Sequence, residues 1–246
     1  LAARGFVVAG VSHYHESWIY GPATIDRAAV LRLWDRPPDL SFALDSLPNI
    51  AELAPVLDMA RVAALGHSSG GNTVIALGGA RLDRGALMAY CRTDAATQDR
   101  GCDYAAAATV VAETPPEASA SYRDPRVRAI VAFDPAAGPG YSKESLADVT
   151  VPVLIVGAAR NDFLPFDQHA KRYADNLPSA TLITLDSGEG HFVFLDPCTL
   201  ELEANGVPLC KDRPGVDRAA VQDRLADDVV AFLGRTIPPS TGRKQP

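Results

Sequence analysis

The sequence is poor in aromatic and sulfur-containing residues and has no long apolar run. Of its 246 residues only 7% are Phe, Trp or Tyr, and there are two methionines and four cysteines. No apolar stretch reaches the roughly 18 residues that a membrane-spanning helix needs, so we expect no stable membrane insertion. Lys and Arg number 23 against 30 Asp and Glu, and the resulting charge of −7 argues against nucleic acid as a partner.

The four cysteines form two local pairs. Cys91 and Cys102 lie in one polar, turn-rich segment, and Cys198 and Cys210 lie in another. An even number in close pairs predicts two disulfide loops and therefore a periplasmic or secreted protein. The alternative is four free thiols in a cytoplasmic protein. Zinc is disfavoured because the pairs lack the two-residue ligand spacing and no histidine lies between them, and we expect no metal.

Apolar patterning predicts an α/β fold. The expected strands are residues 5–11, 61–65, 128–133, 151–156 and 180–185, and the expected helices are 37–57 (interrupted at Pro48), 72–80, 168–176 and 218–233. The strands look apolar on both sides and alternate with helices, which is typical of a mostly parallel sheet with helices on both faces.

The domain organisation is predicted to be simple. We expect one domain over residues 1–236, with a cap-like excursion at 82–125 where the alternation of strands and helices breaks. The polar, proline-containing tail at 237–246 is predicted to be disordered. Because the chain begins with Leu1, we interpret it as a piece of a longer protein that lacks the N-terminal strands of its sheet.

A reactive serine is the strongest functional signal. Residues 66–70 read GHSSG, which matches the pattern G-x-S-x-G between a predicted strand and a predicted helix. In this motif the serine sits on a sharp, strained turn, and the glycines avoid clashes with the neighbouring strand and helix. Ser68 is then the nucleophile, and the backbone N–H of Ser69, at a helix N-terminus, is one oxyanion donor.

A serine nucleophile needs a base and a carboxylate that orients the base. His191 follows the last predicted strand in a flexible loop; His67 is too close in sequence to reach the hydroxyl, and His13, His15 and His169 are less suitably placed. Asp162, on the loop after strand 151–156, is the favoured carboxylate. Asp134, after strand 128–133, is the alternative, and Glu189 is disfavoured because it is too near His191 in sequence.

The order Ser68, Asp162, His191 on successive strand ends resembles that of the α/β-hydrolase superfamily. The stretches LWDRPPDLSFALDSL (33–47), GHSSGGNTVIAL (66–77), DPRVRAIVAFDPA (124–136) and GHFVFLDPC (190–198) resemble the predicted dienelactone-hydrolase, platelet-activating-factor acetylhydrolase-like and cutinase-like group. The resemblance implies an α/β-hydrolase fold and a serine carboxylesterase, lipase or acetylhydrolase that forms an acyl-enzyme on Ser68, with no cofactor.

Two departures from this group limit what the resemblance implies. True dienelactone hydrolases use a cysteine where this chain has Ser68, so their substrate is not inherited. The family's second oxyanion donor would precede Leu1, so we expect the chain as given to be weakly active or to misfold. An acyltransferase, a thioesterase, a serine peptidase or a non-catalytic binding domain on this scaffold are the alternatives. A small-molecule or polymeric ester is the expected substrate, and Tyr14, Trp18 and Tyr20 are candidate pocket residues.

Overall fold

Four parallel strands form the centre of the molecule in this computed structural model, which describes residues 1–26, 28–107 and 115–238, the side chains of 105–107 excepted. The strands are β1 (Val62–His67), β2 (Val127–Phe133), β3 (Val153–Ala158) and β4 (Ala180–Leu185), hydrogen-bonded in that order. Every residue of β3 is buried, as expected of an apolar strand inside a parallel sheet. The sequence prediction of an α/β fold with a parallel sheet is confirmed.

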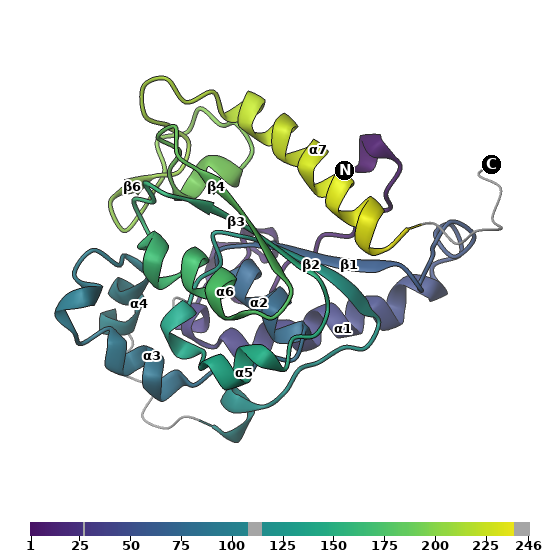
Figure 1. Ribbon diagram of the computed structural model, residues 1–246, viewed down its shortest axis with the longest axis horizontal. Helices are drawn as coiled ribbons and strands as arrows, with labels where there is room; N and C mark the ends of the chain where they lie inside the picture. Colours follow the sequence, from purple (N-terminus) through teal and green to yellow (C-terminus); the bar gives the residue numbers. More distant parts are fainter. Residues whose placement is uncertain (27, 108–114, 239–246) are drawn as a thin grey trace.

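Helices cover both faces of the sheet (Figure 1). Successive strand residues point to opposite faces, so Ile130 and Ile155 belong to one apolar cluster while Val131 and Leu154 belong to another. The first cluster includes residues of α2 (Ser69–Leu77), α5 (Lys143–Ala147) and α6 (Ala170–Asn176), with α1 (Arg36–Ser46) packed at its margin. The second cluster is closed by α7 (Arg218–Thr236), the long yellow helix of Figure 1.

In its described part, the segment between α2 and β2 adds no strand to the sheet. Its described part contains α3 (Arg84–Tyr90) and α4 (Gly101–Ala107), joined by the disulfide Cys91–Cys102. A second disulfide, Cys198–Cys210, closes a loop that carries the two-residue strands β5 (Glu203–Ala204) and β6 (Val207–Pro208). Both predicted disulfides are confirmed.

The prediction of a strand at residues 5–11 is wrong. These residues have no secondary structure, and Val7 and Val8 are about half exposed. An extended segment becomes a strand only when a neighbour takes its backbone hydrogen bonds, and the only strand paired with β1 among the described residues is β2. Residues 5–11 are therefore neither a strand nor buried, because no strand of the described chain pairs with them.

Other boundaries differ from prediction by a few residues. The helix expected at 37–57 ends at Ser46, because Pro48 cannot continue the α-helical hydrogen bonds, and Leu47–Asn49 form a short 3-10 helix instead. Helix α5 was not predicted. Most of the tail predicted to be disordered lies outside the described residues.

Candidate active site

The turn after β1 holds Ser68 in a strained backbone conformation. Its φ is 55° and its ψ is −118°, a region that non-glycine residues rarely occupy. Three backbone hydrogen bonds fix the turn: Ser68 N–H donates to Phe133 O (2.9 Å), and Ser68 O accepts from the N–H groups of Asn72 and Ala136. The surrounding strand, helix and loop therefore determine the strained conformation of Ser68.

Two glycines of the turn, one in the motif and one just after it, allow this close packing. A Cβ on Gly66 would lie 2.2 Å from the carbonyl oxygen of Gly70, and a Cβ on Gly71 would lie 2.8 Å from the Cα of Pro135. Both neighbours are backbone atoms, which cannot move aside without distorting the turn. A Cβ on Gly70 would meet nothing within 4 Å, so this glycine has no steric role.

The structure brings Ser68 and His191 into contact. Ser68 Oγ lies 2.9 Å from Nε2 of His191, a residue that begins the 3-10 helix His191–Phe194 soon after β4. His191 is fully buried, whereas the serine at the turn is only partly buried. This distance allows the hydroxyl to donate its proton to the imidazole, provided that Nε2 carries none.

Two carboxylates lie next to His191, and they contact different parts of it. Asp162, the favoured carboxylate from the sequence, accepts a hydrogen bond from the backbone N–H of His191 (2.9 Å) and pairs with Arg213 (3.2 Å). Asp134, the alternative, faces the ring, with its Oδ2 3.5 Å from Nδ1. Its Oδ1 accepts from the N–H of Ala158, but Oδ2 has no hydrogen-bond partner among the described residues.

Asn161 is the other polar neighbour of the His191 ring. Its Oδ1 accepts hydrogen bonds from the N–H groups of Phe163 and Leu164, so its Nδ2 is the atom that faces Nδ1, at 3.4 Å. An amide donor at Nδ1 favours the tautomer with the proton on Nε2, whereas a carboxylate favours the proton on Nδ1. Only the second tautomer leaves Nε2 free to accept the Ser68 proton.

Burial makes charge at this site costly. It lowers the pKa of His191 to about 3, and it raises the pKa of Asp134 to about 7. His67 is buried beside them, and burial lowers its pKa to about 3 as well. At neutral pH both imidazoles are therefore neutral, which is the state that a general base requires.

His67 was considered from the sequence only as a base, and it has a different place in the structure. Its Nε2 lies 2.9 Å from the carbonyl oxygen of His191, and the two rings are 4.5 Å apart. Because a carbonyl only accepts hydrogen bonds, Nε2 of His67 carries the proton. Together, His67 and Asp162 bind the backbone C=O and N–H of the same residue.

Aromatic rings enclose the remaining sides of His191. Phe163 stacks on it with ring centroids 5.1 Å apart and planes inclined by only 10°, and Phe192 meets it edge to face. Sequence reasoning missed Asn161 and Phe163, although both flank Asp162 in the segment after β3. Their position at the carboxyl end of a parallel strand was the available signal.

The other residues considered from the sequence lie elsewhere. The alternative histidines have other partners: His13 contacts Asp39, His15 contacts the carbonyl of Thr24, and His169 contacts Asp99. Glu189 accepts from the N–H of Ser187. Of the three aromatics considered for the pocket, Trp18 is 72% exposed and Tyr14 and Tyr20 pack against each other. Ser69 is the first residue of α2, as the motif requires.

Neither a metal site nor a membrane span accompanies this geometry in the part of the chain that the structure describes. Within residues 1–26, 28–107 and 115–238 there is no cluster of three or more His, Cys, Asp or Glu arranged to hold a metal ion. None of the helices in the same residues is long and apolar enough to cross a membrane. No protein-family model and no curated protein matches the chain.

Proposed function

We propose that this protein is a serine hydrolase that cleaves carboxylic esters through an acyl-enzyme intermediate. The observation that carries the proposal is the 2.9 Å contact between Nε2 of His191 and the hydroxyl of Ser68, which is itself held in a strained turn between β1 and α2. Strained backbone of this kind persists where the surrounding structure enforces it, and it is common at reactive residues. The α/β-hydrolase resemblance of the sequence supports the same chemistry.

The proposed reaction has two steps. Ser68 attacks the ester carbonyl while His191 removes the hydroxyl proton, and the proton then passes to the leaving alcohol. Water next attacks the acyl-enzyme with His191 again as the base, which releases the acid and restores Ser68. The backbone N–H of Ser69, at the start of α2, is one donor to the oxyanion of each tetrahedral intermediate.

Asp162 is the proposed orienting carboxylate, and its contact explains how it would act. It accepts a hydrogen bond from the backbone N–H of His191, so it fixes the backbone position from which the imidazole side chain extends. Asp134 is the second candidate, and the observation in its favour is its position facing Nδ1. A negative charge there stabilises the imidazolium that forms when His191 accepts a proton.

The two disulfides favour an oxidising compartment. Disulfides persist in the periplasm and outside cells, and they are rare in the cytoplasm of most organisms. We therefore place the proposed hydrolase in the periplasm or among secreted proteins.

A labelling experiment tests the proposal. The protein should react covalently with a fluorophosphonate and hydrolyse a short-chain p-nitrophenyl ester, and Ser68→Ala should abolish both. The matched control is Ser187→Ala, an exposed serine near His191 in the same loop. Unfolding curves of both variants show whether the fold is retained. Absence of labelling in the folded protein, or turnover by Ser68→Ala, would refute the proposal.

A further inference from the structure

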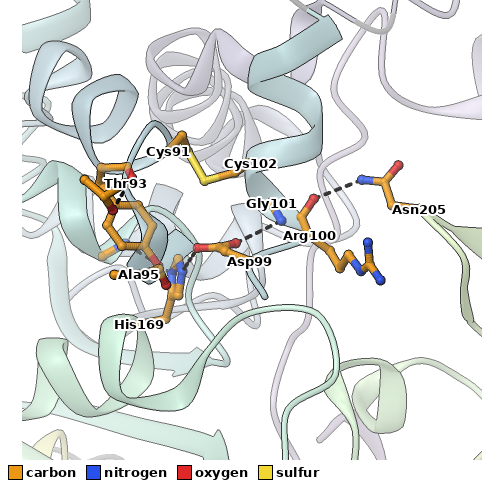
Figure 2. The surroundings of a disulfide bond; sticks show 11 residues. Cys91, Thr93, Ala95, Asp99, Arg100, Gly101, Cys102, His169 and Asn205 are labelled. Atoms are coloured by element: carbon orange, nitrogen blue, oxygen red, sulfur yellow. Dashed lines mark hydrogen bonds and ion pairs between the residues drawn. A yellow bond between two sulfur atoms is a disulfide. The ribbon is translucent and has the colours of Figure 1, made fainter. Parts of the chain in front are cut away.

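A disulfide-closed loop lies close behind the proposed active site. This loop, residues 91–102, runs from the end of α3 to the start of α4, and the Cys91–Cys102 bond joins its two ends. Figure 2 shows the loop with Asp99 pointing away from the disulfide towards His169. Nothing in the mechanism above uses this loop, yet it makes two specific contacts with the segment that follows β3.

The first contact is a buried hydrogen bond between a carboxylate and an imidazole. Asp99 Oδ2 lies 2.7 Å from Nε2 of His169, and both residues are 3% exposed. The other carboxylate oxygen accepts from the N–H of Gly101, which keeps Asp99 in place within its own loop (Figure 2). His169 immediately precedes α6, so this bond attaches the loop to the body of the fold. A carboxylate buried this deeply is costly without its partner.

The second contact reaches the site itself. The N–H of Arg100 donates to the carbonyl oxygen of Phe163 (2.8 Å), and the N–H of Phe163 donates to Asn161. Both backbone groups of Phe163 are thus held, and its ring is the one that stacks on His191 at 5.1 Å. The side chain of Asn205 also donates to the carbonyl oxygen of Arg100, which fixes the loop from its other side (Figure 2).

We propose that the disulfide loop is a positioning element of the active site, which acts through Asp99 and Phe163 to hold the ring of His191 against Ser68. The inference rests on the proposed hydrolase function. The Cys91–Cys102 bond closes the loop and so limits the positions that Asp99 and Arg100 can take. The Asp99–His169 hydrogen bond attaches the loop to the body of the fold. The Arg100–Phe163 hydrogen bond then fixes the residue whose ring stacks on His191. Small displacements of a catalytic group have large effects on rate, so opening the loop lowers turnover rather than ester binding.

A double-mutant cycle tests the route of this effect. The variants are Cys91→Ala with Cys102→Ala, Phe163→Leu, and all three together, with Leu146→Ala as the stability control, because Leu146 is buried in α5 and belongs to a different apolar cluster from Phe163. We expect kcat and the fluorophosphonate labelling rate to fall by about tenfold when the 91–102 bond or the Phe163 ring is removed, with KM little changed. The combined variant should lie within about twofold of Phe163→Leu, because the two changes interrupt one route.

Additive losses in the combined variant would overturn the proposal, as would an unchanged kcat in the variant without Cys91 and Cys102. An equal loss of kcat in Leu146→Ala would also overturn it, since a loss of general stability would then account for the effect of removing the disulfide. Asp99→Asn and Phe163→Tyr are the conservative variants. Phe163→Tyr keeps the stacked ring and should recover most of the activity that Phe163→Leu loses.

A spectroscopic measurement separates this proposal from the proposed function. In protein labelled with ¹³C in its histidine rings, the stacked Phe163 ring should shift the Hε1 resonance of His191 upfield, and Phe163→Leu should remove that shift. Loss of the 91–102 disulfide should move the resonance in the same direction, whether or not the protein turns over an ester. If the protein is inactive but the resonance moves, the function fails and the positioning stands; if the resonance does not move, the positioning fails.

Discussion

Four titratable side chains lie at the proposed site, and burial disfavours the charged form of three of them. His191 and His67 are held neutral by burial, which lowers the pKa of each to about 3, and burial also raises the pKa of Asp134 to about 7. Asp162 is the exception, because it is partly exposed and paired with Arg213. At the scale of single residues, the surroundings of the proposed nucleophile therefore disfavour charged side chains.

Replacing Asp134 should separate stability from activity. Asp134→Asn keeps the acceptor for the Ala158 N–H but removes the buried charge. Since the folded state disfavours the ionised carboxylate, Asp134→Asn should raise the free energy of unfolding at pH 8 by up to about 4 kcal/mol. At pH 4, where Asp134 is protonated in the fold, the gain should be small. Urea unfolding at the two pH values measures both quantities.

The activity of the same variant tells which carboxylate serves the ring. If Asp134 stabilises the imidazolium, Asp134→Asn should lower kcat by about 10²–10⁴. Asp162→Asn is the matched comparison, and it should cost less if Asp162 acts only on the backbone of His191. A larger loss in Asp162→Asn than in Asp134→Asn would assign the ring-orienting role to Asp162 instead.

His67 should matter through one hydrogen bond. His67→Phe keeps an aromatic ring but leaves the buried carbonyl of His191 without a donor, which costs about 1–3 kcal/mol. His67→Gln places an amide donor at similar reach, and it should restore most of the stability and of the kcat lost in His67→Phe. Equal behaviour of the two variants, by thermal unfolding and ester turnover, would contradict this role.

At the scale of elements, two glycines of the β1–α2 turn should respond to substitution in opposite ways. Gly66→Ala puts a methyl group 2.2 Å from a backbone oxygen, so it should abolish both folding at 37 °C and labelling of Ser68. Gly70→Ala adds a methyl group to open space inside a helix, and it should raise stability by about 0.5–1 kcal/mol. Circular dichroism melts of the two variants compare them directly, and a tolerated Gly66→Ala would contradict the packing argument.

The sequence predicted the elements that are buried and regular. Four of the five expected strands are present because near-continuous apolar runs between turns have few other structures available, and β4 (Ala180–Leu185) matches its predicted range. The fifth, at 5–11, needed a partner strand that periodicity does not reveal. Helix α5 has only five residues, too few for a helical pattern to be recognised.

The site was predictable where chemistry follows a motif and not where it depends on packing. Ser68 and His191 meet because both follow parallel strands, whose carboxyl ends lie at one edge of the sheet. Which carboxylate faces Nδ1 depends on side-chain direction, and strand order alone favoured Asp162 over Asp134. The stacked ring of Phe163 depends on the path of the disulfide loop, which carries no periodic signal.

For the whole molecule, the buried histidines predict a loss of stability in acid. Between about pH 3 and pH 6.5 the unfolded chain protonates His67 and His191, whereas the folded protein does not, so stability rises with pH over this window. Asp134 acts in the opposite direction between about pH 4 and pH 7, because the folded protein keeps that proton. The two histidines together change the free energy of unfolding by more than the one carboxyl group does, so the net effect is a loss of stability in acid.

Acidification from pH 7 to pH 4 should therefore lower the free energy of unfolding by roughly 3 kcal/mol. Urea unfolding across this range measures the loss, and His67→Gln should flatten the curve because one of the two buried imidazoles is gone. A stability that is constant or higher at pH 4 would show that these groups are not buried in their neutral forms.

The spacing of the cysteines favours the native disulfide pairing when the reduced chain is oxidised. Each disulfide joins neighbours 11 or 12 residues apart, whereas any mismatched partnership between the two pairs would enclose almost a hundred residues or more. Chain entropy favours the short rings by about 2 kcal/mol, so random oxidation of the reduced polypeptide already selects the native partners. Each cross-link can thus form within its own segment, before the sheet has assembled and without help from an isomerase.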